Sequence, residues 1–467
     1  MNVVLVFPPI TVEDRYGKSV RNVGGVLPPL GLAYIASFLE AHDHCVNIID
    51  GQASMMSMEQ LAEQVSGMKP DVVGLSALTP TIHRANQAAT AIRKKCPEIN
   101  IVMGGHHPSL FPTETITRNQ DVDIVCIGEG EHTMLELTRA LESNEGLSEV
   151  RGIAFRNGNK IRQNSPREFI EDLDSLPFPA RHLLPMKAYR PLPNQWKRLP
   201  VVHMMASRGC PYRCTYCSKS VFGRTYRTRS PQNVIEEINL VIKKYGAKEV
   251  EFWDDTFTMN RSWVHALCDL MIKEGLDIVW TCETRVDRVD LDTLRTMEKA
   301  GCWKISYGIE SGCQDLLDTI KKDITLEQIR NAVKWTKNAE IEAGLSFMLA
   351  LPGETPEDAL KTIRLAVELD PEYAQFCITT PYPGTELFSQ AQCYGNLSCN
   401  FSGFTIWNPV FVPHGYEDAK KILEVQKRAF RAFYCRPMYF LKRISKIRSL
   451  TDLKRNIDGL KVVLSFS

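Results

Sequence analysis

The sequence lacks a membrane-spanning segment and an excess of charge of either sign. No apolar run approaches the roughly 20 residues that a helix needs to cross a bilayer. Met1 leads into the strand-like VVLVF without the basic segment of a signal peptide. The 56 Lys and Arg residues balance 55 Asp and Glu residues, which argues against general binding of polyanions. We therefore expect a cytoplasmic protein without a nucleic-acid partner.

The spacing of the cysteines matches no common disulfide or zinc-binding pattern. There are fourteen, irregularly spaced, and only one Cys-x2-Cys pair is present. That spacing argues against a disulfide scaffold and favours a reducing compartment. A structural zinc site normally uses four ligands from two such pairs, so zinc is disfavoured as well.

One tight group of cysteines stands out in the segment CPYRCTYC. It contains Cys210, Cys214 and Cys217, directly after the apolar run Val201 to Ala206 and before a helical pattern. Three thiolates at this spacing can hold three irons of a [4Fe–4S] cluster and leave the fourth iron open to another ligand. Such a cluster implies an anaerobic or oxygen-protected setting.

Residues 1–145 alternate short apolar strands with helical patterns, and the expected strands are 3–7, 46–49, 71–75, 101–103 and 124–127. This alternation predicts a doubly wound parallel sheet, which binds its ligand at the carboxyl ends of its strands. Gly, Pro, Ser and His collect there. The glycines allow close approach of a large flat ligand, and the hydroxyls of Ser76 and Thr79 can hydrogen-bond a nucleotide tail.

A linker is expected over residues 146–198. It begins with a hairpin whose turn is Asn157-Gly158. Six prolines between Pro177 and Pro200 then favour extended chain. We interpret this part as a strap between two domains.

Residues 199–415 repeat strand and helix about six times, with expected strands at 201–206, 249–253, 278–281, 304–309, 344–349 and 374–379. Charged and polar residues follow these strands, at the end of a parallel barrel where its chemistry takes place. Cys377 lies in the last strand, and we interpret it as a core cysteine. Residues 416–467 predict two helices, 418–435 and 438–464, of which the second is strongly basic.

Several motifs resemble known families. The Cys-x3-Cys-x-aromatic-Cys pattern, with Tyr216 before the last cysteine, closely resembles the signature of radical S-adenosylmethionine (SAM) enzymes. GIESG at 308–312 and LPGET at 351–355 are similar to further elements of that family, although Ala350 replaces the usual Gly. The N-terminal unit is similar to cobalamin-binding domains through Ser76–Leu78, Gly104–Gly105 and GEGE at 128–131. The family's D-x-H-x-x-G motif is missing from the loop that begins at Pro8, which suggests a cobalamin without a histidine on its lower face.

The resemblance implies a Rossmann-like cobalamin domain, a partial (β/α)6 TIM-type barrel and a C-terminal helical segment. The implied cofactors are a [4Fe–4S] cluster on Cys210, Cys214 and Cys217, SAM on its open iron, and cobalamin. The implied SAM-binding residues are Tyr216, Asp254, Asp255, Glu283, Arg285, Glu310 and Ser311. The implied cobalamin-binding residues are Pro8, Pro9, Ser76, Leu78, Thr79, Gly104, Gly105, His106, Gly128, Glu129 and Gly130.

The resemblance also implies an activity. Such enzymes cleave SAM to a 5′-deoxyadenosyl radical, and their cobalamin presents a methyl group to the substrate radical. We expect methylation of an unactivated carbon in a small-molecule or lipid-like substrate, with flavodoxin or ferredoxin as the low-potential electron donor. No catalytic residue beyond the cluster and the SAM site can be assigned.

Two other functions stay open. One is a radical oxidative cyclase that resembles the anaerobic Mg-protoporphyrin IX monomethyl ester cyclases, in which cobalamin takes part without a methyl product. The other is a cobalamin- or redox-sensing binding protein. The basic C-terminal segment fits a solvated helical face, with peripheral contact to an anionic membrane as the alternative.

Overall fold

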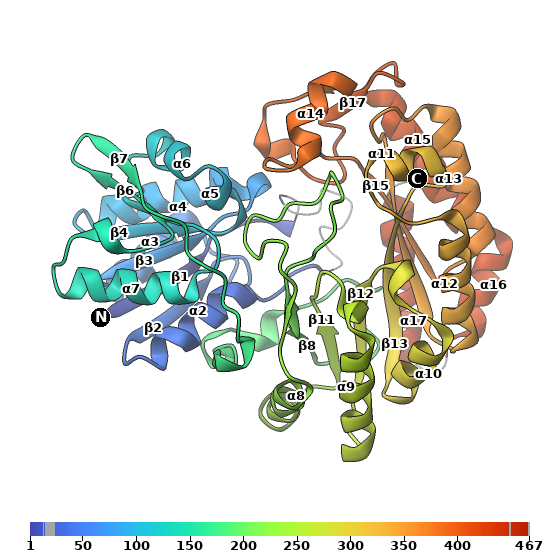
Figure 1. Cartoon of the computed structure of the whole chain (residues 1–467), viewed down its shortest axis with the longest axis horizontal. Coiled ribbons are helices and arrows are strands. Elements are labelled where there is room, and N and C mark those ends of the chain that lie inside the picture. Colours follow the sequence, from blue (N-terminus) through green and yellow to red (C-terminus); the bar gives the residue numbers. More distant parts are fainter. Residues whose placement is uncertain (13, 15–23, 448–449, 466–467) are drawn as a thin grey trace.

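The computed structural model describes residues 1–12, 14, 24–447 and 450–465. Two α/β lobes lie side by side, and the loop that carries the cysteines lies between them (Figure 1). The first lobe is the predicted doubly wound sheet. The second is the predicted partial barrel with helices on its outside.

The first lobe has one seven-stranded sheet in the order β2-β1-β3-β4-β5-β6-β7, whose first five strands are parallel. Its strands are β1 (Asn2–Phe7), β2 (Cys45–Asp50), β3 (Val72–Ser76), β4 (Asn100–Gly104), β5 (Ile124–Cys126), β6 (Ile153–Asn157) and β7 (Lys160–Gln163). Its helices are α2 (Leu30–Glu40), α3 (Met58–Gly67), α4 (Ile82–Lys95), α5 (His106–Leu110), α6 (Pro112–Arg118) and α7 (Glu131–Glu142).

Both faces of this sheet are buried, as the continuous apolar strands predict. Val3 and Leu5 pack into a core with residues of α2 and α7, whereas Val4 and Val6 pack into a second core with α3 and α4. Successive side chains of a strand point to opposite faces. One apolar strand therefore serves both layers of helices.

The predicted hairpin belongs to this sheet and not to the linker. β6 pairs antiparallel with β5, and β7 pairs antiparallel with β6. Ile153 and Phe155 are buried in the core that α2 and α7 cover. The sheet therefore extends past residue 145, and the strap itself begins after Gln163.

The barrel has six parallel strands in sequence order. They are β8 (Val201–Met204), β11 (Glu249–Phe252), β12 (Val279–Thr284), β13 (Cys302–Glu310), β14 (Glu342–Leu349) and β15 (Tyr373–Ile378). Its outer helices are α8 (Pro231–Tyr245), α9 (Arg261–Glu274), α10 (Leu291–Lys299), α11 (Gln314–Thr319), α12 (Leu326–Asn338) and α13 (Pro356–Leu369). All six predicted barrel strands are confirmed.

Local sequence sets the ends of these helices. Ser230 caps α8 by accepting a hydrogen bond from the Asn233 amide at 3.2 Å, and Pro231 occupies the first turn. Gly246 ends the helix in a left-handed conformation, with φ of 65°. Such helices bury their apolar faces against the strands and form one continuous barrel core.

The last part of the chain packs beside β15. It contains α14 (Glu386–Tyr394), the hairpin of β16 (Gly395–Leu397) and β17 (Phe411–Pro413), and then α15 (Ala419–Tyr434), α16 (Pro437–Ser445) and α17 (Leu450–Ser465). The predicted helix 438–464 is therefore two helices, since α16 ends at Ser445. Residues 448 and 449, within that prediction, lie outside the described residues. Among the described helices, none is long and apolar enough to cross a membrane.

Candidate active site

A short β-ribbon closes the neck of the cysteine loop. β9 (Ser207–Arg208) pairs antiparallel with β10 (Arg227–Thr228), so residues 209–226 leave and return at one place. Gly209 lies in this neck with φ of 81°, and a Cβ atom there would lie 2.3 Å from the Thr225 carbonyl oxygen. Only glycine fits this conformation and this spacing. The neck thus holds the loop at the carboxyl end of β8.

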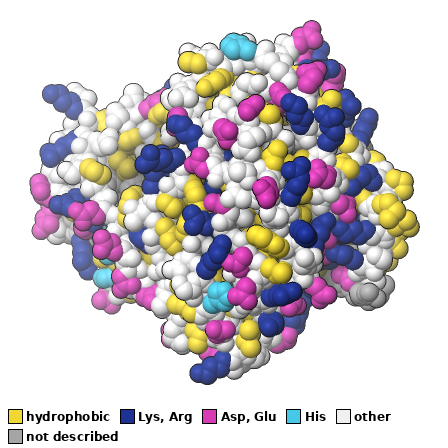
Figure 2. Space-filling view, turned by 45° about the vertical axis from the view of Figure 1, so that its right-hand side comes forward, with side chains coloured by type: hydrophobic (Ala, Val, Ile, Leu, Met, Phe, Trp, Pro, Cys, Tyr) yellow, Lys and Arg dark blue, Asp and Glu magenta, His cyan; other side chains and the backbone are white. Residues whose placement is uncertain are grey.

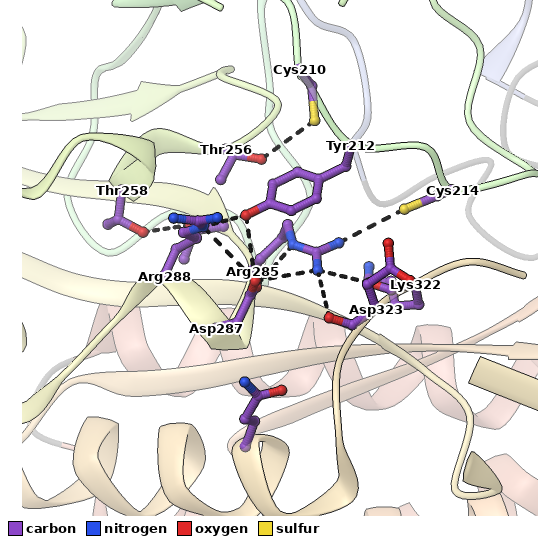
Figure 3. Close-up of polar contacts among 12 residues, drawn as sticks. Cys210, Tyr212, Cys214, Thr256, Thr258, Arg285, Asp287, Arg288, Lys322 and Asp323 are labelled. Atoms are coloured by element: carbon purple, nitrogen blue, oxygen red, sulfur yellow. Dashed lines mark hydrogen bonds and ion pairs between the residues drawn. The ribbon is translucent and has the colours of Figure 1, made fainter. Parts of the chain in front are cut away.

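The cysteines of this loop have different neighbours, and Figure 3 shows two of them, Cys210 and Cys214, at the barrel mouth. Cys210 is buried, with its Sγ 3.8 Å from the Thr256 hydroxyl. Arg285 directs its Nη1 at the Cys214 Sγ, also at 3.8 Å. Burial raises the pKa of the Cys217 thiol, and the nearby Lys219 ammonium opposes that rise. Two cations therefore stand beside these thiols, Arg285 at Cys214 and Lys219 at Cys217.

The three cysteines of the loop fit an iron–sulfur cluster better than a single metal ion. Among the described residues, no three Cys, His, Asp or Glu side chains converge on one point that could hold a metal ion. A zinc site would need such convergence, whereas each thiolate of a [4Fe–4S] cluster binds a different iron. Three separated thiols on one loop, with cations beside them, are compatible with a cluster.

Tyr216 joins the cysteine loop to the end of β13. Its hydroxyl donates to the Glu310 carboxylate at 2.9 Å, and Lys322 pairs with the same carboxylate at 2.6 Å. Glu310 has a φ of 67°, so its backbone is held in a region that non-glycine residues rarely occupy. Burial, followed by the charge of Glu310, raises the pKa of Tyr216 well above its usual value. The predicted residues Tyr216 and Glu310 are thus in contact at the site. The sequence did not predict that Lys322 joins them.

The two adjacent aspartates after β11 have different surroundings. Asp254 is buried and accepts hydrogen bonds from the Ala206 amide, at 3.2 Å, and from the Ser207 hydroxyl. Burial raises the pKa of Asp254 to about 7. The side chain of Asp255 is exposed. Asp254 therefore braces the neck of the cysteine loop, and Asp255 is the aspartate that a ligand can reach.

Glu283 is the second accessible carboxylate of the barrel mouth. It lies in β12 with an exposed side chain, yet surrounding protein raises its pKa, first through desolvation and then through the charge of Glu251. Glu283 is thus solvent-accessible but closely surrounded by other carboxylates and by protein. Asp255 also acts on the pKa of Glu283, so the two carboxylates lie near each other. They fit the ammonium group of SAM.

Arg285 and Ser311 are engaged within the protein. The Arg285 guanidinium stacks 3.6 Å from the centre of the Tyr212 ring and donates to Asp287 at 2.9 Å and to the Lys322 carbonyl oxygen at 2.7 Å (Figure 3). Ser311 is fully buried, and its hydroxyl accepts a hydrogen bond from the Cys313 amide at 3.1 Å. Arg285 therefore positions the loop around Cys214, and Ser311 shapes the turn after β13.

The strand ends of the first lobe form one edge. Ser76 and Gly104 are neighbours in the ladder between β3 and β4. Gly105 has a φ of 99°, and a Cβ atom there would lie 2.7 Å from the Ala77 carbonyl oxygen. At Gly128 a Cβ atom would lie 3.9 Å from the Val221 carbonyl oxygen, so this glycine packs against the cysteine loop. Backbone without side chains at this edge fits a corrin ring.

The remaining residues predicted for this edge vary in accessibility. Pro8 is buried; Pro9 and Leu78 are half-buried. Thr79 is buried, and its hydroxyl lies 3.3 Å from His107 Nδ1. The same burial lowers the pKa of His107 to about 4. Thr79 is thus partnered inside the lobe.

His106 connects the two lobes. Its Nδ1 lies 3.0 Å from the hydroxyl of Ser220, three residues after the last cysteine. Its side chain is exposed, and desolvation lowers its pKa while the charge of Asp255 opposes that shift. The carboxyl ends of β4 and β11 therefore face each other across the cysteine loop.

The GEGE motif is engaged in a different way. Glu129 accepts hydrogen bonds from Arg208 Nη1 at 2.9 Å and from Arg227 Nη1 at 2.9 Å. Glu131 pairs with Arg208 Nη2 at 2.6 Å. All four side chains are buried. Glu129 and Glu131 thus fasten the first lobe to the β-ribbon of the barrel, and Arg208 and Arg227 were not predicted from the sequence. Gly130 instead packs inside the first lobe, where a Cβ atom would lie 2.6 Å from Ile35.

Comparisons with known proteins agree with this geometry. Residues 18–138 match the B12 binding domain model, and residues 204–366 match the radical SAM superfamily model. An uncharacterized methyltransferase of Pyrococcus horikoshii is 36% identical over 98% of both chains. The anaerobic magnesium-protoporphyrin IX monomethyl ester cyclase of Rubrivivax gelatinosus is 28% identical over 91% of this chain and 76% of its own. The radical SAM methyltransferase TsrM of Kitasatospora setae, solved with cobalamin and a [4Fe–4S] cluster, has the same fold, with a TM-score of 0.74, 14% identity and coverage of 99% and 98%.

Proposed function

This chain belongs to the radical SAM enzymes that carry a cobalamin-binding domain, and from that membership we propose that it methylates an unactivated carbon atom. Its cofactors are a [4Fe–4S] cluster, SAM and cobalamin. It acts on a small molecule and needs a reductant. We also propose the class of the substrate and the residues that hold each cofactor.

The observation that carries the proposal is the contact between His106 and Ser220. It brings the glycine-lined edge of the first lobe against the loop of Cys210, Cys214 and Cys217. A corrinoid at that edge and a cluster on that loop would enclose one reaction space. Close, fixed approach of reactants is a main source of catalytic rate.

The chain's own residues have distinct roles in this proposal. Asp255 and Glu283 bind the ammonium of SAM, and Tyr216, held by Glu310 and Lys322, keeps the cysteine loop against the barrel. Arg285 holds the loop near Cys214. When bound, the cofactors supply a carbon radical from SAM and a methyl group on cobalt. The protein orients these groups and keeps water from them.

A low-potential flavodoxin or ferredoxin is the proposed electron donor, and the cytoplasm is the proposed location. All fourteen cysteines are free thiols, which suits a reducing compartment.

The mass of the product tests the proposal. Reconstituted enzyme, reductant and SAM are incubated with an extract of small molecules, and the products are compared with those of the Cys214→Ala variant. We expect one metabolite to gain a CH2 unit with wild type only, and the methyl hydrogens to be labelled when methyl-deuterated SAM is used. A product without an added carbon would contradict methyl transfer.

The similarity to the Rubrivivax cyclase supports a second candidate. A radical cyclase would form a new ring without adding a carbon atom. The same mass comparison separates the two, because the cyclase product carries no label from the methyl group of SAM.

Peripheral contact with an anionic membrane is a further part of the proposal. Met438, Leu441 and Ile444 of α16 expose 72%, 60% and 63% of their surface. Figure 2 shows apolar side chains at the right-hand edge of the molecule, over α16, with Lys and Arg side chains beside them. Apolar side chains bordered by cations suit an interfacial helix. Sedimentation with phosphatidylglycerol vesicles, which Leu441→Glu should abolish, tests this contact.

A further inference from the structure

A cavity lies between the last barrel strand and the C-terminal helices. It has a volume of about 370 Å³ and lies against Tyr373, Gln375, Trp407, Phe430, Tyr434 and Tyr439. That volume is within the range of pockets that bind small molecules. Protein interiors are otherwise close-packed, so an aromatic cavity of this size needs an explanation. We call this space the β15 chamber.

The mouth of the β15 chamber is apolar and faces solvent. Phe440 and Ile444 of α16, and Leu453 and Ile457 of α17, line the chamber and expose 41%, 63%, 41% and 47% of their surface. Single exposed apolar residues are common, but a contiguous group marks a binding surface. The apolar path therefore continues from the surface into the protein.

Two arginines also line the chamber. Arg443 donates to the Asn456 side chain at 2.9 Å and to the Tyr373 hydroxyl at 3.1 Å, and Arg455, which is 9% exposed, donates to the Trp196 carbonyl oxygen at 2.7 Å. Among the described residues, Arg443 Nη1 and Arg455 Nε have no acceptor.

The carboxylates near these arginines leave part of the arginines' hydrogen-bonding capacity unused. Asp452 lies 3.5 Å from Arg455, and the charge of Glu342 is among the causes that raise the pKa of Arg443, but among the described residues no carboxylate accepts a hydrogen bond from Arg443 Nη1 or Arg455 Nε. A buried donor without a partner costs free energy. A small reorientation of either guanidinium would give its free donor to an anionic group in the chamber.

One lining residue of the chamber, Gln375, lies on the same strand face as a residue near Glu310. Gln375 lines the chamber, and Cys377 lies two residues further along β15, on the same face of the strand. Glu310 is close enough to Cys377 that its charge contributes to the raised pKa of that thiol, after burial. Cys377 therefore lies along β15 between the chamber residue Gln375 and Glu310.

We infer that the β15 chamber binds the apolar chain of a monomeric alkyl carboxylate or a similar single-chain anionic amphiphile. The chain enters between α16 and α17, the anionic head group stays with Arg443 and Arg455, and the chain lies along β15 toward Glu310. As the substrate class, this inference rests on the proposed function, because an alkyl chain offers unactivated carbon atoms. As a binding site, it stands on the chamber alone.

Calorimetric titration of the full-length holoenzyme with decanoate and with decan-1-ol tests the inference. We expect decanoate to bind more tightly than decan-1-ol. Arg443→Gln should weaken decanoate binding about tenfold and leave decan-1-ol unchanged. Ile444→Trp, at the mouth, should weaken both. Lys454→Gln and Ile272→Trp, which change exposed residues outside the chamber, serve as matched controls and should bind as wild type does.

Other outcomes of these titrations would overturn the inference. They are absence of decanoate binding, equal affinity for the acid and the alcohol, or an equal loss in Lys454→Gln. Binding to phosphatidylglycerol vesicles without binding of monomeric decanoate would assign the surface to a membrane and also overturn the chamber. Because the titrations require no turnover, decanoate binding without any methylated product would contradict the proposed function and leave the chamber intact.

Discussion

Arg208 and Glu129 form a buried ion pair, with Nη1 and Oε1 2.9 Å apart, between the barrel and the first lobe. The guanidinium also lies between the rings of Tyr34 and Phe222, at 5.2 and 5.1 Å from their centres. Arg208 is two residues before Cys210. The contact therefore fixes the start of the cysteine loop to the lobe that carries the glycine-lined edge, and the GEGE motif has a structural role at this interface.

Breaking this pair should destabilise the protein strongly. We expect Glu129→Gln to lower the free energy of unfolding by about 3 kcal/mol, because it leaves two buried arginines with less negative charge. Glu136→Gln is the matched control, since Glu136 pairs with Arg167 but its side chain is 46% exposed; its loss should stay under about 1 kcal/mol. Urea denaturation of both variants measures the difference. Equal losses would show that the contact between the lobes contributes little.

Asp254 and Asp255 should respond differently to the same substitution. Asp255→Asn should reduce SAM affinity about tenfold, because an accessible charge that pairs with the ammonium is lost. Asp254→Asn should keep SAM affinity within about twofold and change stability instead, because its carboxylate is buried against the loop neck. Equilibrium dialysis of reconstituted protein with SAM measures both. A larger loss of affinity in Asp254→Asn would reverse the assignment.

We expect Glu354 to make the free energy of unfolding decrease as the pH rises. It is fully buried and accepts hydrogen bonds from the Tyr416 hydroxyl and the Ala350 amide, each at 2.6 Å. Burial raises the pKa of Glu354 from 4.5 to about 7. Between pH 4.5 and pH 7 the folded state keeps the Glu354 proton and the unfolded state loses it. The resulting contribution to the free energy of unfolding is roughly 3 kcal/mol. It is fully present below pH 4.5 and is lost by pH 7.

The Glu354→Gln variant isolates that contribution. It removes the titrating group, so its unfolding free energy should decline less than that of wild type between pH 5 and pH 8. Urea denaturation at several pH values in this range provides the comparison. Parallel curves for the two proteins would show that Glu354 does not titrate in this window.

The cysteines of the loop should be individually required for the cluster. We expect Cys214→Ala, after anaerobic reconstitution, to lose most of its iron and the visible absorption of the cluster. Cys45→Ala changes an exposed cysteine in β2 of the first lobe, and it should bind as much iron as wild type. Iron and sulfide analysis measures both. A full cluster in Cys214→Ala would remove Cys214 from the set of ligands.

The strand pattern was predictable because it depends on local sequence. Apolar runs, several of them followed directly by charged or polar residues, locate all six barrel strands, and the cysteine spacing locates the loop. The hairpin around Asn157-Gly158 was also predicted, but its pairing with β5 was not. Pairing depends on contacts between residues that are distant in sequence.

The sequence predicts where the site lies better than it predicts what each side chain of the site contacts. The sequence places Asp254 and Asp255 together after a strand. The structure buries Asp254 against the loop neck and leaves Asp255 accessible to a ligand. Arg285 and Glu129 are engaged with protein charges in the structure, and their predicted contacts with cofactors stay predictions. Arg208 and Arg227 flank the cysteine loop in sequence, and a pair of arginines facing a Glu-x-Glu motif is the signal that could have indicated the contact between the lobes.

Reductive cleavage of SAM tests the central claim most directly. Anaerobically reconstituted enzyme is reduced with dithionite and incubated with SAM and decanoate, and 5′-deoxyadenosine is measured by chromatography. The account predicts that 5′-deoxyadenosine accumulates with wild type and is absent with Cys214→Ala. Its absence from wild type that carries a full cluster and bound cobalamin, with decanoate and with a broad extract of small molecules, would contradict the account.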